Sequence, residues 1–69
     1  MKFNMQIDHN YASFNTSKSG VYVFVDSFDN QEFDVRVGSL LDSNVVGTLH
    51  AESDDELNEK LEKMTADFL

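Results

Sequence analysis

The sequence of 69 residues contains no cysteine and no proline, and only five residues are lysine or arginine. Without cysteine, neither a disulfide nor a thiolate zinc site can hold the chain together. The few basic residues do not cluster, which disfavours binding to nucleic-acid phosphates. No apolar run approaches the roughly 18 residues of a membrane-spanning helix, and the N-terminus lacks the apolar core of a signal peptide. We therefore expect a cytoplasmic protein that binds neither nucleic acid nor membrane directly.

Acidic and aromatic residues stand out in what the sequence does contain. Thirteen Asp and Glu give a formal net charge of −8, and six Phe and two Tyr are present. Charge of this size alone favours disorder, but so many aromatic residues indicate a folded chain. The length predicts a single domain, residues 1–69, with a thin core and a stability of roughly 3–5 kcal/mol. Basic proteins are its natural partners, and formation of a homodimer would add buried surface.

Alternation of apolar and polar residues predicts several strands. They are Lys2–Ile7, Val21–Val25, Glu32–Val37 and Val45–His50, with Tyr11–Phe14 as a short strand or a loop. Both faces of Val21–Val25 are apolar, which favours a central position in the sheet. Gly38 indicates a bulge or a bend. Polar turn segments separate the strands, so neighbouring strands should be antiparallel: Asn15–Gly20, Asp26–Gln31 and Leu41–Asn44.

A C-terminal helix is predicted by two signals. Residues 53–56 form a capping box, in which Ser53 caps the helix and Glu56 reaches back. An apolar stripe at helical spacing follows, made of Leu57, Leu61, Met64 and Phe68. We therefore expect an α+β fold, an antiparallel β-meander of three to five strands with this helix packed on one sheet face. The other face would expose Tyr22, Phe24, Asp34, Arg36, Val46, Thr48 and His50.

The first candidate binding surface is an acidic ridge on the helix. Helical spacing turns Asp55, Glu59 and Glu62 away from the apolar stripe, with Glu56 close by. Residues 52–69 hold seven acids and two lysines, so they carry −5 of the total charge of −8, and the strands carry −3. Electrostatic binding would therefore also use the acids around the second turn: Asp26, Asp29, Glu32 and Asp34. The alternative is a solvated face that keeps a small protein soluble.

The second candidate surface is the open sheet face. Tyr22, Phe24 and Val46 would form a patch edged by Asp34, Arg36 and His50. Aromatic residues with arginine are typical of the centres of protein interfaces. A homodimer or another partner would cover this face; alternatively Tyr11, Phe14 or Phe28 folds over it as a second small core.

Catalytic and metal-binding patterns are weak. His9 and His50 lie far apart in sequence, with no nucleophile or metal motif around them. The oxygen-rich segment from Asp26 to Asp34 lacks the glycine and glutamate spacing of an EF-hand, which favours a polar turn. The three glycines form neither a P-loop nor a dinucleotide-binding motif. We expect no enzymatic activity, no cofactor and no metal site.

In its size, its charge of −8 and its ridge of Asp55, Glu59 and Glu62, the chain resembles small acidic phage-encoded inhibitors of host defence, including some anti-CRISPR proteins. This resemblance implies a non-enzymatic nucleic-acid mimic that occupies a nucleic-acid-binding groove on a host protein, in the host cytoplasm. The segment Gly47–Leu57, a strand running into a capped acidic helix, is similar to the core of HicB-type antitoxins. That family adds a further strand and often a DNA-binding region, so the antitoxin interpretation is the weaker one. The sequence thus predicts a protein-binding inhibitor, with an assembly module that associates through its open sheet face as the alternative.

Overall fold

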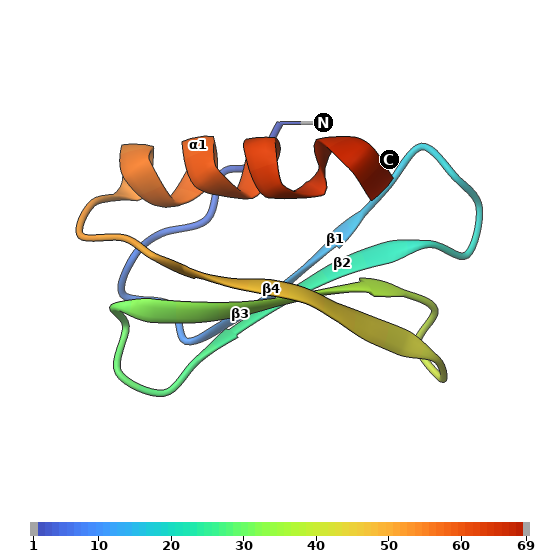
Figure 1. Cartoon of the computed structure of the whole chain (residues 1–69), viewed down its shortest axis with the longest axis horizontal. Coiled ribbons are helices and arrows are strands. Elements are labelled where there is room, and N and C mark those ends of the chain that lie inside the picture. Colours follow the sequence, from blue (N-terminus) through green and yellow to red (C-terminus); the bar gives the residue numbers. More distant parts are fainter. Residues whose placement is uncertain (1, 69) are drawn as a thin grey trace.

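The computed structural model describes residues 2–68 and contains a four-stranded antiparallel sheet followed by one helix (Figure 1). The strands neighbour one another in chain order, because short loops join them: β1 (Tyr11–Asn15), β2 (Tyr22–Ser27), β3 (Glu32–Gly38) and β4 (Ser43–His50). Helix α1 (Asp54–Thr65) follows β4 and ends in a short 3₁₀ turn, η1 (Ala66–Phe68). The predicted α+β meander with a C-terminal helix is confirmed, and β2 is a central strand as expected.

The N-terminal segment, residues 2–7, has no regular secondary structure and does not join the sheet, so the strand predicted there is wrong. The alternation of apolar and polar residues in this segment reflects burial of every second side chain, because Phe3 and Met5 lie in the core. Its main chain bonds to side chains of other elements instead. Asn58 accepts a hydrogen bond from the Met5 N–H at 2.8 Å and donates one to the Met5 C=O at 2.9 Å. An extended chain needs partners for its polar groups, but these need not come from a strand.

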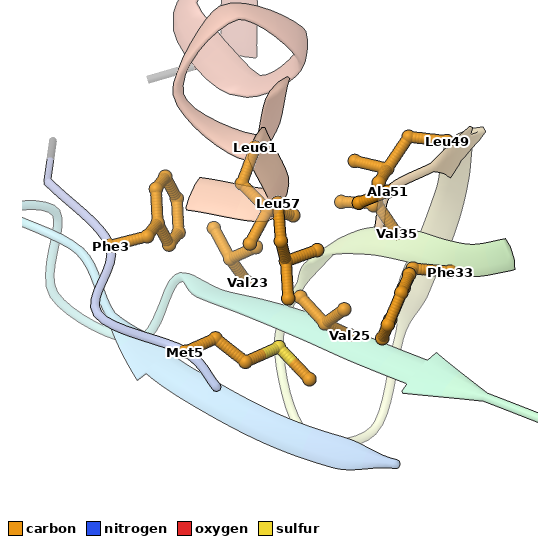
Figure 2. Packing of buried hydrophobic residues seen from close by; sticks show 10 residues of the cluster. All are labelled: Phe3, Met5, Val23, Val25, Phe33, Val35, Leu49, Ala51, Leu57 and Leu61. Carbon is orange, nitrogen blue, oxygen red and sulfur yellow. The ribbon is translucent and has the colours of Figure 1, made fainter. Parts of the chain in front are cut away.

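The core lies between the inner sheet face, α1 and the N-terminal segment (Figure 2). Helix α1 reaches it through Leu57 and Leu61, which are both fully buried. The sheet contributes fully buried residues from its two central strands: Val23, Val25, Phe33 and Val35. Phe3 and Phe14 meet edge to face, with ring centroids 5.0 Å apart, and so join the N-terminal segment to β1. Burial of these apolar side chains is the main favourable contribution to folding.

The apolar stripe of the helix is shorter than the spacing predicts. Leu57 and Leu61 are buried and Met64 is half-buried, but Phe68 is 48% exposed. The physical reason is that α1 ends at Thr65, and the tighter 3₁₀ turn after it changes the angle between successive side chains. Thr65 takes the buried position instead, and its hydroxyl donates to the Leu61 carbonyl at 2.7 Å.

The Ser53 cap at the start of α1 forms as predicted, but Glu56 reaches back to the residue before the cap and not to Ser53 itself, so the predicted capping box forms only in part. Ser53 Oγ accepts a hydrogen bond from the Glu56 N–H at 3.1 Å, and the Glu56 carboxylate accepts one from the Glu52 N–H at 2.7 Å. This second bond, together with the nearby Lys60 ammonium, lowers the pKa of Glu56 from its usual 4.5. Glu56 therefore fixes the main chain that leads into α1, at the residue before the cap.

A pH-dependent contribution to stability is expected from the hydrogen bond between the Glu56 carboxylate and the Glu52 N–H. A carboxyl whose pKa is lowered by folding stabilises the fold above its unfolded pKa, and the contribution disappears as the pH falls from 4.5 through the lowered value. The Glu56→Gln variant should unfold at lower urea concentration than the wild type at pH 7, and the difference should narrow below pH 4.5. Urea midpoints measured across this range test the prediction, which a pH-independent difference would contradict.

A bulge interrupts the pairing of β3 with β4. Val35 pairs with Gly47 but Arg36 pairs with Val45, so Val46 is the additional residue on β4. The extra residue shifts the alternation of side chains: Val46 packs against the core, and Val45, which is 65% exposed, takes the outer position opposite Arg36. The prediction that Val46 lies on the open face is therefore wrong.

Gly38 ends β3 rather than forming this bulge. Its φ of 153° is one that other residues rarely adopt, and a Cβ atom there would collide with the Asp42 carbonyl oxygen. The glycine therefore marks the bend into the β3–β4 loop, residues 39–42.

Candidate protein-interaction surfaces

The acidic ridge on α1 is exposed along its length. Asp55, Glu59 and Glu62 all lie on the solvent side, because Leu57 and Leu61 turn the opposite side toward the sheet. Glu59 pairs with Lys63 at 3.1 Å, whereas Asp55 and Glu62 have no ion-pair partner within residues 2–68. Neighbouring Cβ atoms at this helical spacing are about 5–6 Å apart, so the carboxylates form a row of negative charge.

Glu56 is half-buried beside the ridge and is bound within the molecule. Its carboxylate holds the Glu52 N–H and lies 3.6 Å from the Lys60 ammonium. Lys60 in turn donates to the His50 carbonyl at 2.6 Å and so connects α1 to the end of β4. Of the four helix acids predicted to bind a partner, Glu56 is thus the one whose carboxylate accepts a main-chain hydrogen bond within the molecule.

Three of the four acids around the β2–β3 turn are also engaged within the chain. Asp29 accepts hydrogen bonds from the Glu32 and Gln31 N–H groups, each at 3.0 Å, and these bonds lower its pKa. Asp26 pairs with Arg36 at 3.1 Å, and Asp34 accepts a bond from the Thr48 hydroxyl at 2.8 Å. Glu32 is exposed, with no side-chain partner within residues 2–68.

Asp26 and Asp34 lie on the sheet face opposite the helix ridge. Asp34 alternates along β3 with the buried Phe33 and Val35, so its side chain points to the outer face, away from α1. Asp26 faces it on β2 in the register of the sheet. Figure 1 shows α1 lying along the other side. The structure therefore does not join the sheet acids to the helix ridge as one surface.

The outer sheet face carries an aromatic and arginine cluster, as the sequence predicts. The Arg36 guanidinium lies over the Phe24 ring, 5.6 Å from its centroid, and the Tyr22 ring is 5.9 Å from that of Phe24. These neighbours leave Phe24 only 6% exposed, so the prediction that its side chain is exposed on this face is wrong. Cation–π contact and the ion pair to Asp26 hold Arg36 flat on the sheet.

No second small core covers this face within residues 2–68. Phe14 lies on the inner side, packed against the core cluster. Tyr11 is 54% exposed, and Phe28, in the β2–β3 turn, is fully exposed. The alternative in which one of these residues folds over the outer face is therefore excluded.

An exposed apolar pair in the β3–β4 loop was not predicted as a site. Leu40 and Leu41 are 73% and 100% exposed, and with Tyr22, Gly20 and Ser39 they line a shallow depression at one end of the sheet. The signal in the sequence is two adjacent leucines within a turn, where apolar residues have no core to enter. Tyr22 thus belongs to two features of the outer face.

The two histidines are not brought together into a site. Both are exposed, and His50 Nε2 lies 3.9 Å from the Glu52 carboxylate. Within residues 2–68, no group of three or more His, Asp or Glu side chains is arranged to hold a metal ion, and no helix has the length and apolar character needed to cross a membrane.

Comparisons with protein-family models, with curated proteins and with solved structures give no significant match to this chain. The surfaces described above are therefore the basis for a function.

Proposed function

We propose that the chain is a non-enzymatic protein-binding domain that uses its acidic ridge to occupy a basic site, of the kind that holds nucleic acid, on another protein. The observation that carries this proposal is the exposure of Asp55, Glu59 and Glu62 in one row on a helix whose other side is buried. A rigid helix holds such charges at constant spacing, so little conformational entropy is lost when they bind.

The distribution of cations supports the same function. Lys60 and Lys63 pair with Glu56 and Glu59, so Asp55 and Glu62, at the two ends of the ridge, have no ion-pair partner within residues 2–68. A surface of one sign attracts a basic groove over a Debye length of about 8 Å at physiological salt. Such a surface also repels nucleic acid, which makes competition for a shared partner the natural mode of inhibition.

Reversal of the ridge charges tests the proposal. A partner is first captured from the native host with the wild-type chain and purified. The triple variant Asp55→Lys, Glu59→Lys, Glu62→Lys should then bind it at least about a hundredfold more weakly, because truncation or reversal of several interfacial charges costs several kcal/mol. A polyanion such as heparin should displace the wild-type chain, and circular dichroism should show that the helix persists.

A second triple variant provides the matched control. Glu32→Lys, Asp42→Lys and Asp67→Lys make the same change in net charge at exposed positions outside the ridge. Retained binding by this control identifies the ridge as the site. Equal loss in both variants would mean that total charge alone matters, and unchanged binding by the ridge variant would refute the proposal.

A second function, an assembly module that associates through its outer sheet face, is supported by the uncovered Tyr22 and the exposed Leu41. Phe24 is too deeply buried to be a clean test, so Tyr22→Ala combined with Leu41→Ala is the better variant. Loss of the captured partner in this variant, with binding retained by the ridge variant, would favour the second function over the first.

A further inference from the structure

The sheet has two edge strands, β1 and β4, which differ in how accessible their main-chain groups are to another strand. An exposed edge strand offers unpaired N–H and C=O groups to any other strand, and proteins usually block such edges with bulges, charges or covering elements. The chain contains no proline that could do so.

The β4 edge is obstructed. The bulge at Val46 breaks its regular alternation in the middle of the strand. At its end, the Lys60 ammonium from α1 donates to the His50 carbonyl at 2.6 Å. A second strand cannot run along β4 without displacing this lysine and following the bulge.

The β1 edge is free. Hydrogen bonds from Ser27 N–H to the Asn10 carbonyl and from Thr16 N–H to the Val21 carbonyl show which residues of this stretch face β2. In an antiparallel ladder, residues whose N–H and C=O groups face the partner strand alternate with residues whose groups face away from it. Asn10 and Thr16 face β2, so the main-chain groups of Tyr11, Ser13 and Asn15 point away from it. No hydrogen bond to these groups is present within residues 2–68, and all three residues are exposed.

We propose that β1 pairs with β1 of a second copy of this chain, antiparallel and centred on Ser13, to form a continuous sheet across a dimer. This register places Ser13 opposite Ser13 of the second copy and Tyr11 opposite Asn15. Every outward-pointing main-chain group of β1 then has a partner, since each of the three facing pairs is of the type that exchanges two hydrogen bonds.

Charge favours a second copy as the occupant. Strand β1 has the sequence YASFN, with no charged residue in a chain of net charge −8, so two copies meet there without direct repulsion. The nearest acid or lysine is Asp8 on one side and Lys18 on the other, and both are exposed. The same register brings Asp8 of one copy toward Lys18 of the other at each end of the pairing.

The dimer has a geometric consequence for the acidic ridge. Antiparallel pairing within one sheet has its two-fold axis perpendicular to the sheet, so both α1 helices lie on the same side. Two ridges then face the same partner surface, and binding of both would be stronger than binding of either. The pairing itself does not depend on the function proposed for the ridge.

Sedimentation of the full-length chain from about 10 µM to about 1 mM tests the pairing. The wild-type mass should rise from one copy toward two. Amide exchange of Tyr11, Ser13 and Asn15 should slow as the concentration rises, while that of Thr48, on the β4 edge, stays constant. A mass of one copy throughout, or slowing at Thr48 without slowing at Ser13, would overturn the proposal.

Substitutions at Ser13 separate edge pairing from other contacts. Ser13→Pro removes an outward N–H from each copy and should weaken the dimer about tenfold or more. Ser13→Lys places like charges opposite each other and should prevent pairing, whereas the exposed Ser17→Lys makes the same charge change outside the strand and should not.

A mixture of Ser13→Lys and Ser13→Glu places opposite charges across the pairing. If this mixture forms dimers, both variants must be folded, so the loss of dimer in Ser13→Lys alone is not caused by unfolding. The mixture should restore a mass of two copies as a mixed dimer. Dimers that persist in Ser13→Pro and Ser13→Lys, but are lost in Tyr22→Ala with Leu41→Ala, would assign association to the outer sheet face and overturn the edge proposal.

Discussion

Replacement of Asn58 by alanine should lower the free energy of unfolding by about 3 kcal/mol, because it leaves two partly buried main-chain groups of Met5 without partners. The same amide also donates to the Asp54 carbonyl at 2.9 Å, so it fastens the N-terminal segment to the first turn of α1. For a domain whose total stability is roughly 3–5 kcal/mol, this is most of the margin. Urea unfolding at neutral pH measures the loss.

Two further measurements identify the mechanism. Asn58→Asp keeps an acceptor for the Met5 N–H but loses the donor to its carbonyl, so its stability should lie between those of the wild type and Asn58→Ala. Exchange of the Met5 amide should accelerate in both variants more than exchange of Val25 in the central strand. Equal acceleration at both amides would show that Asn58 stabilises the whole domain and not the N-terminal segment in particular.

Replacement of Leu61 by alanine should have the larger effect, about 3–5 kcal/mol, and leave the chain largely unfolded at 25 °C. Leu61 is fully buried between α1 and the sheet, in the same core cluster as Phe3 and Met5 of the N-terminal segment (Figure 2). The cost combines the lost burial of its side chain with the cavity that remains, since the small core has few residues to fill it.

The neighbouring residue Glu62 provides the control for this prediction. It is exposed on the same turn of α1, and Glu62→Ala should change the free energy of unfolding by less than about 0.5 kcal/mol. Far-ultraviolet circular dichroism during thermal unfolding compares the two variants. A folded Leu61→Ala with near wild-type stability would show that α1 contributes little to the core.

The sequence determined most of the secondary structure, because the relevant signals are local. The alternation in β2 and β3 and the Ser53 cap depend on residues within a few positions of one another, and all three predictions hold. The exposed helix ridge also follows from local spacing, since a helix with one buried side must present the opposite side to solvent.

Contacts between distant residues decided the rest. The N-terminal segment has the alternation of a strand but packs beside α1, outside the sheet, because the Asn58 side chain, far along the sequence, supplies its hydrogen bonds. One additional residue in β4 moved Val46 from the outer face to the core. The position of this bulge depends on the pairing with β3, so the sequence of β4 alone does not predict it.

The sequence by itself determined the acidic character, the fold class and the ridge on α1. Only the tertiary structure decided that Asp26 and Asp34 lie on the face opposite the ridge, that nothing within residues 2–68 covers the outer face, and that β1 is the free edge in this part of the chain. Charge and periodicity are properties of the chain alone, whereas a surface is defined by which elements pack on which face. In a domain with one helix and two sheet faces, that packing determines where another protein can bind.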